Sequence, residues 1–183
     1  MWPFARPKKD PRSGRLVFLI ECLLNQNARD LGAAESPAAT REMMDLLADA
    51  EIGMVQIPCS EIACLGFERR RPTGQSIRHA LETPKPATCC QHLAVVTVDR
   101  IQCYLDQGFE VLAILGGNEQ SPGCAVHTTA AGEAQLDDRS GVFMRALAVE
   151  LAQRNLRIEF RGMRDADPKL LSEDLDWLRN RLS

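Results

Sequence analysis

The chain has 183 residues, of which 45% are hydrophobic and 26% are charged, and its formal net charge is −3. These values are typical of one folded globular domain and exclude an intrinsically disordered chain. The slightly acidic balance provides no broad basic surface, so we do not expect nucleic acid as a partner. No apolar run approaches the roughly 20 residues of a membrane-spanning helix, so we do not expect a membrane association either.

The first residues differ from the rest of the chain. Residues 1–14 hold three prolines and several basic side chains, and they lack the apolar segment of a secretory signal. We therefore expect a flexible basic tail over residues 1–14, a single α/β domain over residues 15–183, and a cytoplasmic protein.

The first part of the domain predicts a strand, a helix and a second strand. Residues 15–21 form an apolar run without a helical period, which predicts a strand. Ser36-Pro37 supplies a serine cap and a proline at the first helical position, and an apolar stripe at helical spacing follows as far as Ala50. Residues 52–58 repeat the strand pattern, and residues 64–75 form a basic loop broken by proline and glycine.

The second part continues the alternation. The expected elements are, in order, a turn at Pro84 and Pro86, a helix over 88–107, a strand over 109–115, a surface excursion over 130–140, a helix over 141–153, a strand over 156–160 and a last helix that begins at Asp167-Pro168. Strands that alternate with helices of this length indicate βαβ units. The sequence therefore predicts a three-layer, Rossmann-like α/β fold with a mostly parallel central sheet, without giving the strand order.

Three of the seven cysteines follow a predicted strand. Cys22 comes after the first strand, Cys59 after the second and Cys124 after the third. Open parallel sheets bind their ligands at the carboxyl ends of the strands. If these strands are parallel, the three thiols meet at one edge of the sheet.

The other four cysteines are expected to be structural thiols. An odd number of cysteines without a secretion signal argues against a disulfide framework. Cys64 lies at the start of the basic loop, Cys103 lies within the long helix, and Cys89 and Cys90 are neighbours that cannot share one helix face.

Three thiols at one edge suit several chemistries. With His127 as a fourth ligand they would form a Cys₃His zinc site. With an iron–sulfur cluster they would leave one iron free of protein ligands and available as a Lewis acid. As free thiols they would serve redox chemistry or the binding of a small molecule. A phosphatase loop fits poorly, because six residues separate Cys22 from Arg29 and that loop requires five.

Polar residues beside these cysteines are candidates for further roles. Glu61 stands two residues after Cys59 and could transfer protons if its site is dry, and Ser121 stands three residues before Cys124. The remaining candidates are the amides that follow Cys22, which could donate hydrogen bonds to a cluster or a substrate: Asn25, Gln26 and Asn27.

Three short motifs share a pattern with a known family. "CLLNQN" around Cys22, "IPCSE" around Cys59 and "SPGC" around Cys124, in this order and each after a strand, resemble the thiouracil desulfurase family. The similarity is closest to its branch of related desulfidases and covers about residues 15–165. The chain differs from that pattern at Glu21, where a histidine is frequent, and at three positions within the motifs: Ser60, Gly123 and Ala125.

The resemblance implies a [4Fe-4S] cluster held by Cys22, Cys59 and Cys124, with the fourth iron open to the sulfur of a small thiolated compound. It also implies that Glu61 handles protons and that Ser121 helps to orient the substrate. The expected function is therefore that of a desulfidase. The alternatives are a non-catalytic module that binds zinc or a cluster, and a thiol-redox or small-molecule-binding domain.

Overall fold

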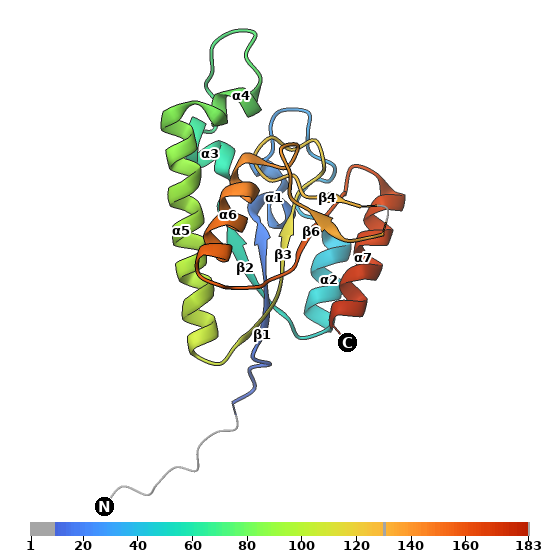
Figure 1. Ribbon diagram of the computed structural model, residues 1–183. Helices are drawn as coiled ribbons and strands as arrows, with labels where there is room; N and C mark the ends of the chain where they lie inside the picture. Colours follow the sequence, from blue (N-terminus) through green and yellow to red (C-terminus); the bar gives the residue numbers. More distant parts are fainter. Residues whose placement is uncertain (1–9, 130, 183) are drawn as a thin grey trace, which may run out of the picture.

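A parallel four-stranded sheet forms the centre of the computed structural model, which describes residues 10–129 and 131–182 (Figure 1). The strand order is β2-β1-β3-β6, and every neighbouring pair is parallel. The strands are β1 (Arg15–Ile20), β2 (Gly53–Ile57), β3 (Glu110–Gly116) and β6 (Phe160–Gly162). The predicted α/β fold with a parallel sheet is confirmed.

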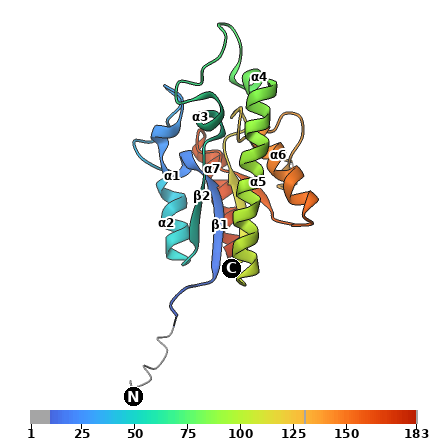
Figure 2. The same ribbon diagram turned by 90° about the vertical axis from the view of Figure 1, so that its left-hand side faces the viewer.

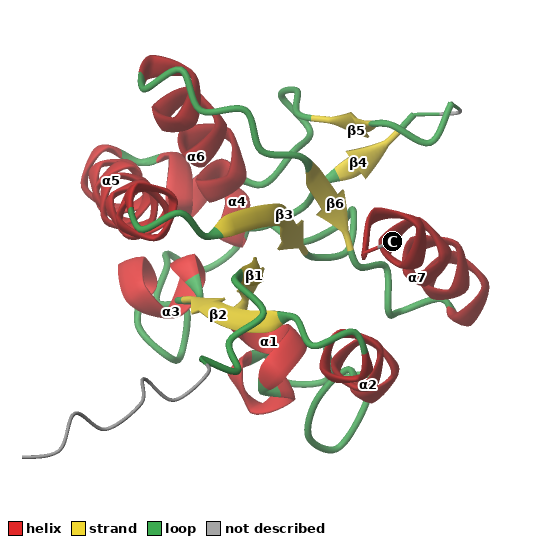
Figure 3. Ribbon diagram, turned by 90° about the horizontal axis from the view of Figure 1, so that it is seen from below, coloured by secondary structure: helices red, strands yellow, loops and turns green. Residues whose placement is uncertain are grey.

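Helices cover both faces of this sheet. In the view along the strands, α5 (Pro84–Asp106) and α6 (Val142–Gln153) lie on one side, whereas α2 (Arg41–Asp49) and α7 (Pro168–Leu182) lie on the other (Figure 3). The central strands are apolar on both faces: Val17, Leu19, Ala113 and Ile114 have no exposed surface. Burial on both faces explains why these strands read as continuous apolar runs.

Short elements gather where the strands end. They are α1 (Glu21–Leu24), a 3₁₀ turn at Gln26–Ala28, α3 (Ser60–Leu65), α4 (Ile77–Glu82) and the small hairpin of β4 (His127–Thr128) and β5 (Ala134–Gln135). The quarter-turn view shows α1, α3 and α4 above the carboxyl ends of β1 and β2 (Figure 2). The hairpin lies partly within the expected surface excursion at 130–140.

Several predicted boundaries are wrong. The helix expected from Ser36 begins at Arg41, because Ala38 and Thr40 pair with the backbone of Gln26 and Leu23 and hold this segment extended. The turn expected at Pro84 and Pro86 is the first turn of α5. Proline fits there because the amide it lacks would have no partner within the helix.

The last strand is displaced along the chain. It covers Phe160–Gly162 instead of residues 156–160, since the pairing with β3 begins at the carbonyl of Glu159. The last helix begins as predicted, and the Asp167 carboxylate accepts hydrogen bonds from the backbone of Lys169 and Leu170.

Two further findings bear on the sequence predictions. Asp10–Gly14 carry no helix or strand, and residues 1–9 of the expected tail lie outside the described residues. Within the part of the chain that the structure describes, no helix is long and apolar enough to cross a membrane.

Candidate functional site

The carboxyl ends of β1, β2 and β3 bring three cysteines to the same edge of the sheet. Cys22 lies in α1, two residues beyond β1, and Cys59 lies two residues beyond β2 as the N-cap of α3. Cys124 is eight residues beyond β3, but its loop folds back on the strand. The Gly117 amide donates to the Cys124 carbonyl at 2.8 Å, and Gly117 bridges to Ala125.

Cys22 and Cys124 contact each other. A hydrogen bond from the Cys124 thiol lowers the pKa of Cys22, against the effect of burial, and the Arg29 guanidinium lowers it further. The same contact and burial raise the pKa of Cys124 well above its usual value. The contact therefore favours the thiolate form of Cys22 over that of Cys124.

Ser121 belongs to this sulfur pair. Its hydroxyl lies 2.9 Å from the Cys124 sulfur and also accepts a hydrogen bond from the Cys124 amide at 3.4 Å. The position of Ser121, three residues before Cys124, thus lets one side chain orient the thiol that follows it.

Glycines make room for the Cys124 loop. A side chain at Gly117 would begin 2.8 Å from the Cys124 sulfur and 3.1 Å from the Ile20 side chain. A side chain at Gly123 would begin 2.3 Å from the Ser60 hydroxyl. Ser60 and Gly123 therefore face each other, and the absence of a side chain at Gly123 leaves space for the Ser60 hydroxyl.

Glu21 connects the first two cysteine loops. Its carboxylate accepts a hydrogen bond from the Cys59 backbone amide at 2.9 Å. Glu21 thus fixes the position of Cys59 relative to the end of β1. Burial raises the pKa of the Cys59 thiol to about 11, and the Glu61 charge adds to this effect.

Glu61 is buried and oriented. It is 8% exposed, and its Oε2 accepts a hydrogen bond from Arg69 Nε at 3.1 Å. Arg69 is 2% exposed and also donates hydrogen bonds to the carbonyls of Phe67 and Ala28. It therefore anchors the basic loop to the segment that follows Cys22. Glu61 also acts electrostatically on Cys124, which places it near the sulfur pair.

The amides after Cys22 are engaged within the protein. Asn25 accepts hydrogen bonds from the backbone and side chain of Asn27, and both residues are exposed. Gln26 is 1% exposed and bonds to Thr40, to Asp165 and to the Glu35 backbone. Gln26 therefore has a structural role in the loop that follows Cys22, whereas Asn25 and Asn27 lie on the protein surface.

Asp165 is the residue of this region that sequence reasoning missed. Its carboxylate accepts hydrogen bonds from Arg29 at 2.6 and 2.8 Å, from Thr40 at 2.9 Å and from Asn118 at 2.8 Å, besides Gln26 at 3.1 Å. Burial raises the pKa of Asp165, but the hydrogen bonds and the charge of Arg29 lower it more, so the net shift is downward. Arg29 and Asp165 are 136 residues apart, and no local pattern connects them.

A comparison with protein-family models finds no match to this chain. An uncharacterized protein of Methanocaldococcus jannaschii is 25% identical over 112 residues, which cover 61% of this chain and 68% of that protein. No solved structure matches.

The cysteines at the sheet edge do not surround a common point as the ligands of a single ion would. Among the described residues, no other group of three or more His, Cys, Asp or Glu side chains does so either. His127, the expected fourth zinc ligand, has Nδ1 3.9 Å from Glu119. Thiolates of a cluster bind different irons and need not converge on one point.

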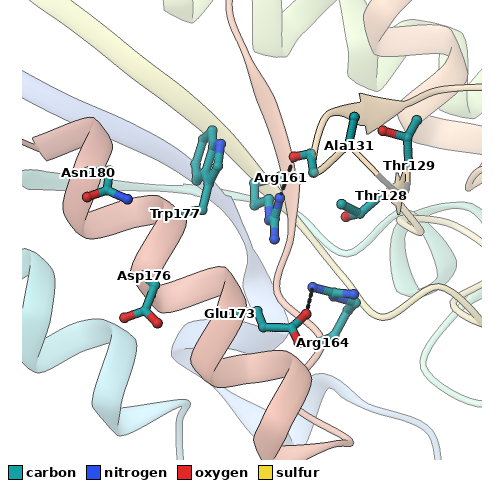
Figure 4. A pocket seen from close by; sticks show the side chains of 10 residues that line it. Thr128, Thr129, Ala131, Arg161, Arg164, Glu173, Asp176, Trp177 and Asn180 are labelled. Carbon is teal, nitrogen blue, oxygen red and sulfur yellow. Dashed lines mark hydrogen bonds and ion pairs between the residues drawn. The ribbon is translucent and has the colours of Figure 1, made fainter.

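A separate cavity of about 600 Å³ lies between the β4 end and α7 (Figure 4). Arg161 and Arg164 line it, but Asp174 accepts hydrogen bonds from both, and the Arg161 guanidinium lies 5.5 Å from the centre of the Trp177 ring. No cysteine lines this cavity, so it is distinct from the sulfur-bearing edge.

The remaining cysteines correct one expectation. Cys64 and Cys89 form a disulfide that joins α3 to α5, whereas we expected structural thiols at both positions. Cys90 lies 3.8 Å from the Cys64 sulfur, so both neighbours on α5 reach the same partner. Cys103 is a free, exposed thiol.

Proposed function

We propose that this chain is an iron–sulfur-dependent desulfidase that removes sulfur from a small thiolated compound, such as a thiouracil-like base. The observation that carries the proposal is the arrangement of Cys22, Cys59 and Cys124 after three parallel strands that end at one edge of the sheet. The three motifs around these cysteines add the resemblance to thiouracil desulfurases.

In this proposal Cys22, Cys59 and Cys124 hold a [4Fe-4S] cluster. When bound, the cluster supplies an iron without a protein ligand, which is a Lewis acid for a sulfur atom. The residues of the chain shape the site: Glu21 fixes the Cys59 loop, and Ser121 orients Cys124. A site with free thiols and a cluster suits the reducing conditions of the cytoplasm, where we place the protein.

Glu61 is the residue that moves protons. Because Arg69 binds Oε2, the other oxygen is left for a substrate. Oε1 lies 3.6 Å from the point where a Gly123 side chain would begin, which is the side of the Cys124 loop. From there Glu61 can give a proton to the carbon that loses its sulfur or to a ring nitrogen of the product.

Anaerobic purification tests the cofactor. We expect a brown protein with iron and acid-labile sulfide in the ratio of a [4Fe-4S] cluster. Cys22→Ser, Cys59→Ser and Cys124→Ser should each lose the iron, and Cys103→Ser, which changes an exposed thiol, is the matched control. A colourless protein with stoichiometric zinc after anaerobic reconstitution would overturn the proposal.

A screen of thiolated bases and nucleosides for sulfide release tests the activity. Glu61→Gln keeps an oxygen that can accept from Arg69, so we expect full iron content with a loss of sulfide release. Equal release by this variant and the parent would remove Glu61 from the proposed chemistry.

The contact between Cys22 and Cys124 favours a second candidate function, a thiol-redox domain. In that case the chain stays free of iron under anaerobic reconstitution, and mild oxidation forms a reversible Cys22–Cys124 disulfide. Iron binding that protects both thiols from alkylation would exclude this alternative.

A further inference from the structure

Three sulfur atoms lie together between α3 and α5, outside the proposed cluster site. Cys64 near the end of α3 is bonded to Cys89 on α5, and their Cα atoms are 5.6 Å apart. The Cys90 sulfur is 3.8 Å from the Cys64 sulfur. Cys64 therefore has two adjacent partners on one helix turn, one bonded and one free.

The three differ in exposure. Cys90 is 1% exposed, whereas Cys64 and Cys89 are both partly exposed. An external thiol can therefore reach the bond, while the third sulfur is shielded from solvent. Disulfides in reducing compartments are usually transient and serve catalysis or redox sensing. A disulfide with a free thiol beside it has the components for exchange.

We propose that Cys64, Cys89 and Cys90 form a thiol–disulfide exchange site, which takes a small or protein dithiol as its reductant and controls the attachment of α3 to α5. In the internal step, the Cys90 thiolate attacks the Cys64 sulfur. The Cys64–Cys90 bond forms and the Cys64–Cys89 bond breaks. Cys89 leaves as a thiolate and takes up the proton that Cys90 lost. The step is redox-neutral and needs no other reagent.

The opening step uses the external dithiol. One of its thiolates attacks the disulfide and its second thiol resolves the mixed disulfide. Two protein thiols result, and the dithiol becomes a disulfide. Two electrons pass from the reductant to the protein, and a small disulfide reverses the step. Burial and the nearby Glu61 raise the pKa of Cys90 to about 11, which keeps its thiol mostly protonated and slows its attack on the disulfide.

The site acts on the helix that carries Glu61. Helix α3 has six residues, which is too short to be stable without tertiary support, and Cys59 is its N-cap. The disulfide fixes this helix to the 23-residue α5. Reduction removes that link. The redox state of the Cys64–Cys89 disulfide therefore determines the mobility of α3, which carries Glu61 and begins after Cys59.

Mapping the bonds tests the exchange without any metal or substrate. Cys89 and Cys90 fall in one tryptic peptide, between Arg78 and Arg100, so single variants or fragment-ion mass spectrometry of that peptide must distinguish them. In Cys89→Ser we expect a Cys64–Cys90 disulfide and loss of the free Cys64 thiol. In Cys90→Ser we expect the original pair. A folded Cys89→Ser protein with a free Cys64, under conditions that close the bond in the parent, would overturn the proposal.

A second measurement uses the unaltered protein. After equilibration in a thiol–disulfide buffer and an acid quench, alkylation should label both Cys89 and Cys90 in the disulfide-containing molecules. Label on Cys90 alone would contradict exchange. Amide hydrogen exchange in α3 should be faster after reduction, with α7 unchanged as the internal control. An α3 that exchanges at the same rate in both states would refute the control of its attachment.

Discussion

Replacement of Asp165 should be the most damaging single change at the carboxyl edge of the sheet. Its side chain is 4% exposed, and that of Arg29, its ion-pair partner, is 9% exposed. Asp165→Ala removes the only carboxylate that pairs with Arg29 among the described residues and leaves a buried guanidinium whose remaining partners are the Ala33 carbonyl at 3.1 Å and the Cys22 sulfur. Removing one partner of a buried ion pair costs about 3–5 kcal/mol.

The same change also removes the acceptor shared by three other side chains. Gln26, Thr40 and Asn118 each donate to Asp165. A hydrogen bond of this kind contributes about 1 kcal/mol, but water can enter the vacated space and replace part of it. We therefore expect the loss in unfolding free energy for Asp165→Ala at the upper end of about 3–5 kcal/mol. Asp165→Asn keeps one acceptor oxygen and should lose less.

Equilibrium unfolding in urea measures these losses, with Asp176→Ala as the matched control. Asp176 pairs with Arg179 on the surface of α7, where both side chains are more than half exposed, and such pairs contribute about 1 kcal/mol or less. The reasoning fails if Asp165→Ala is no more destabilising than Asp176→Ala. An equal loss would mean that the five hydrogen bonds to Asp165 offset only its own desolvation.

The remaining predictions concern pH, packing and the disulfide. The pKa of Asp165 in the folded protein is below its ordinary value of 3.8. The contribution of Asp165 to the unfolding free energy is therefore complete above pH 3.8 and disappears as the pH falls through the folded pKa. The difference in urea stability between the parent and Asp165→Asn should shrink over that range. Gly123→Ala should cost about 1–3 kcal/mol by overpacking against the Ser60 hydroxyl, and Ser60→Ala in the same chain should restore part of it; additive losses would contradict the contact. Under oxidising conditions Cys64→Ser should lower the unfolding free energy by about 3.5 kcal/mol, because the disulfide restricts the unfolded chain across a separation of 25 residues. Cys103→Ser, which changes an exposed free thiol, should have little effect. Under a strong reductant the effect of Cys64→Ser should vanish.

The sheet was predictable because each buried strand leaves a strong local signal. Residues 15–21, 52–58 and 109–115 are apolar runs of strand length, and the structure has strands at all three. The shared edge for Cys22, Cys59 and Cys124 then follows from the parallel topology alone. Ser121 could be found for a similar reason, since three residues are enough to return its hydroxyl to the Cys124 sulfur.

Contacts between distant segments left no such signal. Cys64 and Cys89 come together because α3 packs on α5, and composition argued against a disulfide. Pro84 was ambiguous because proline suits a turn and the first turn of a helix equally well. The spacing of Arg29 from Cys22 gives no indication of its ion-pair partner Asp165, which lies near the other end of the chain.

Three of the four residues that differ from the desulfurase motifs each make a specific contact: Glu21, Ser60 and Gly123. Glu21 does not leave an empty place where relatives frequently have histidine, because its carboxylate holds the Cys59 amide. Ser60 and Gly123 occupy each other's space, so either change alone would create a clash or a void. All three residues lie in the loops that carry the cysteines, where Glu21 binds the Cys59 amide and Ser60 lies against Gly123. In the proposed desulfidase the three cysteines would hold the cluster, and the contacts of Glu21, Ser60 and Gly123 around them would determine which thiolated compound binds.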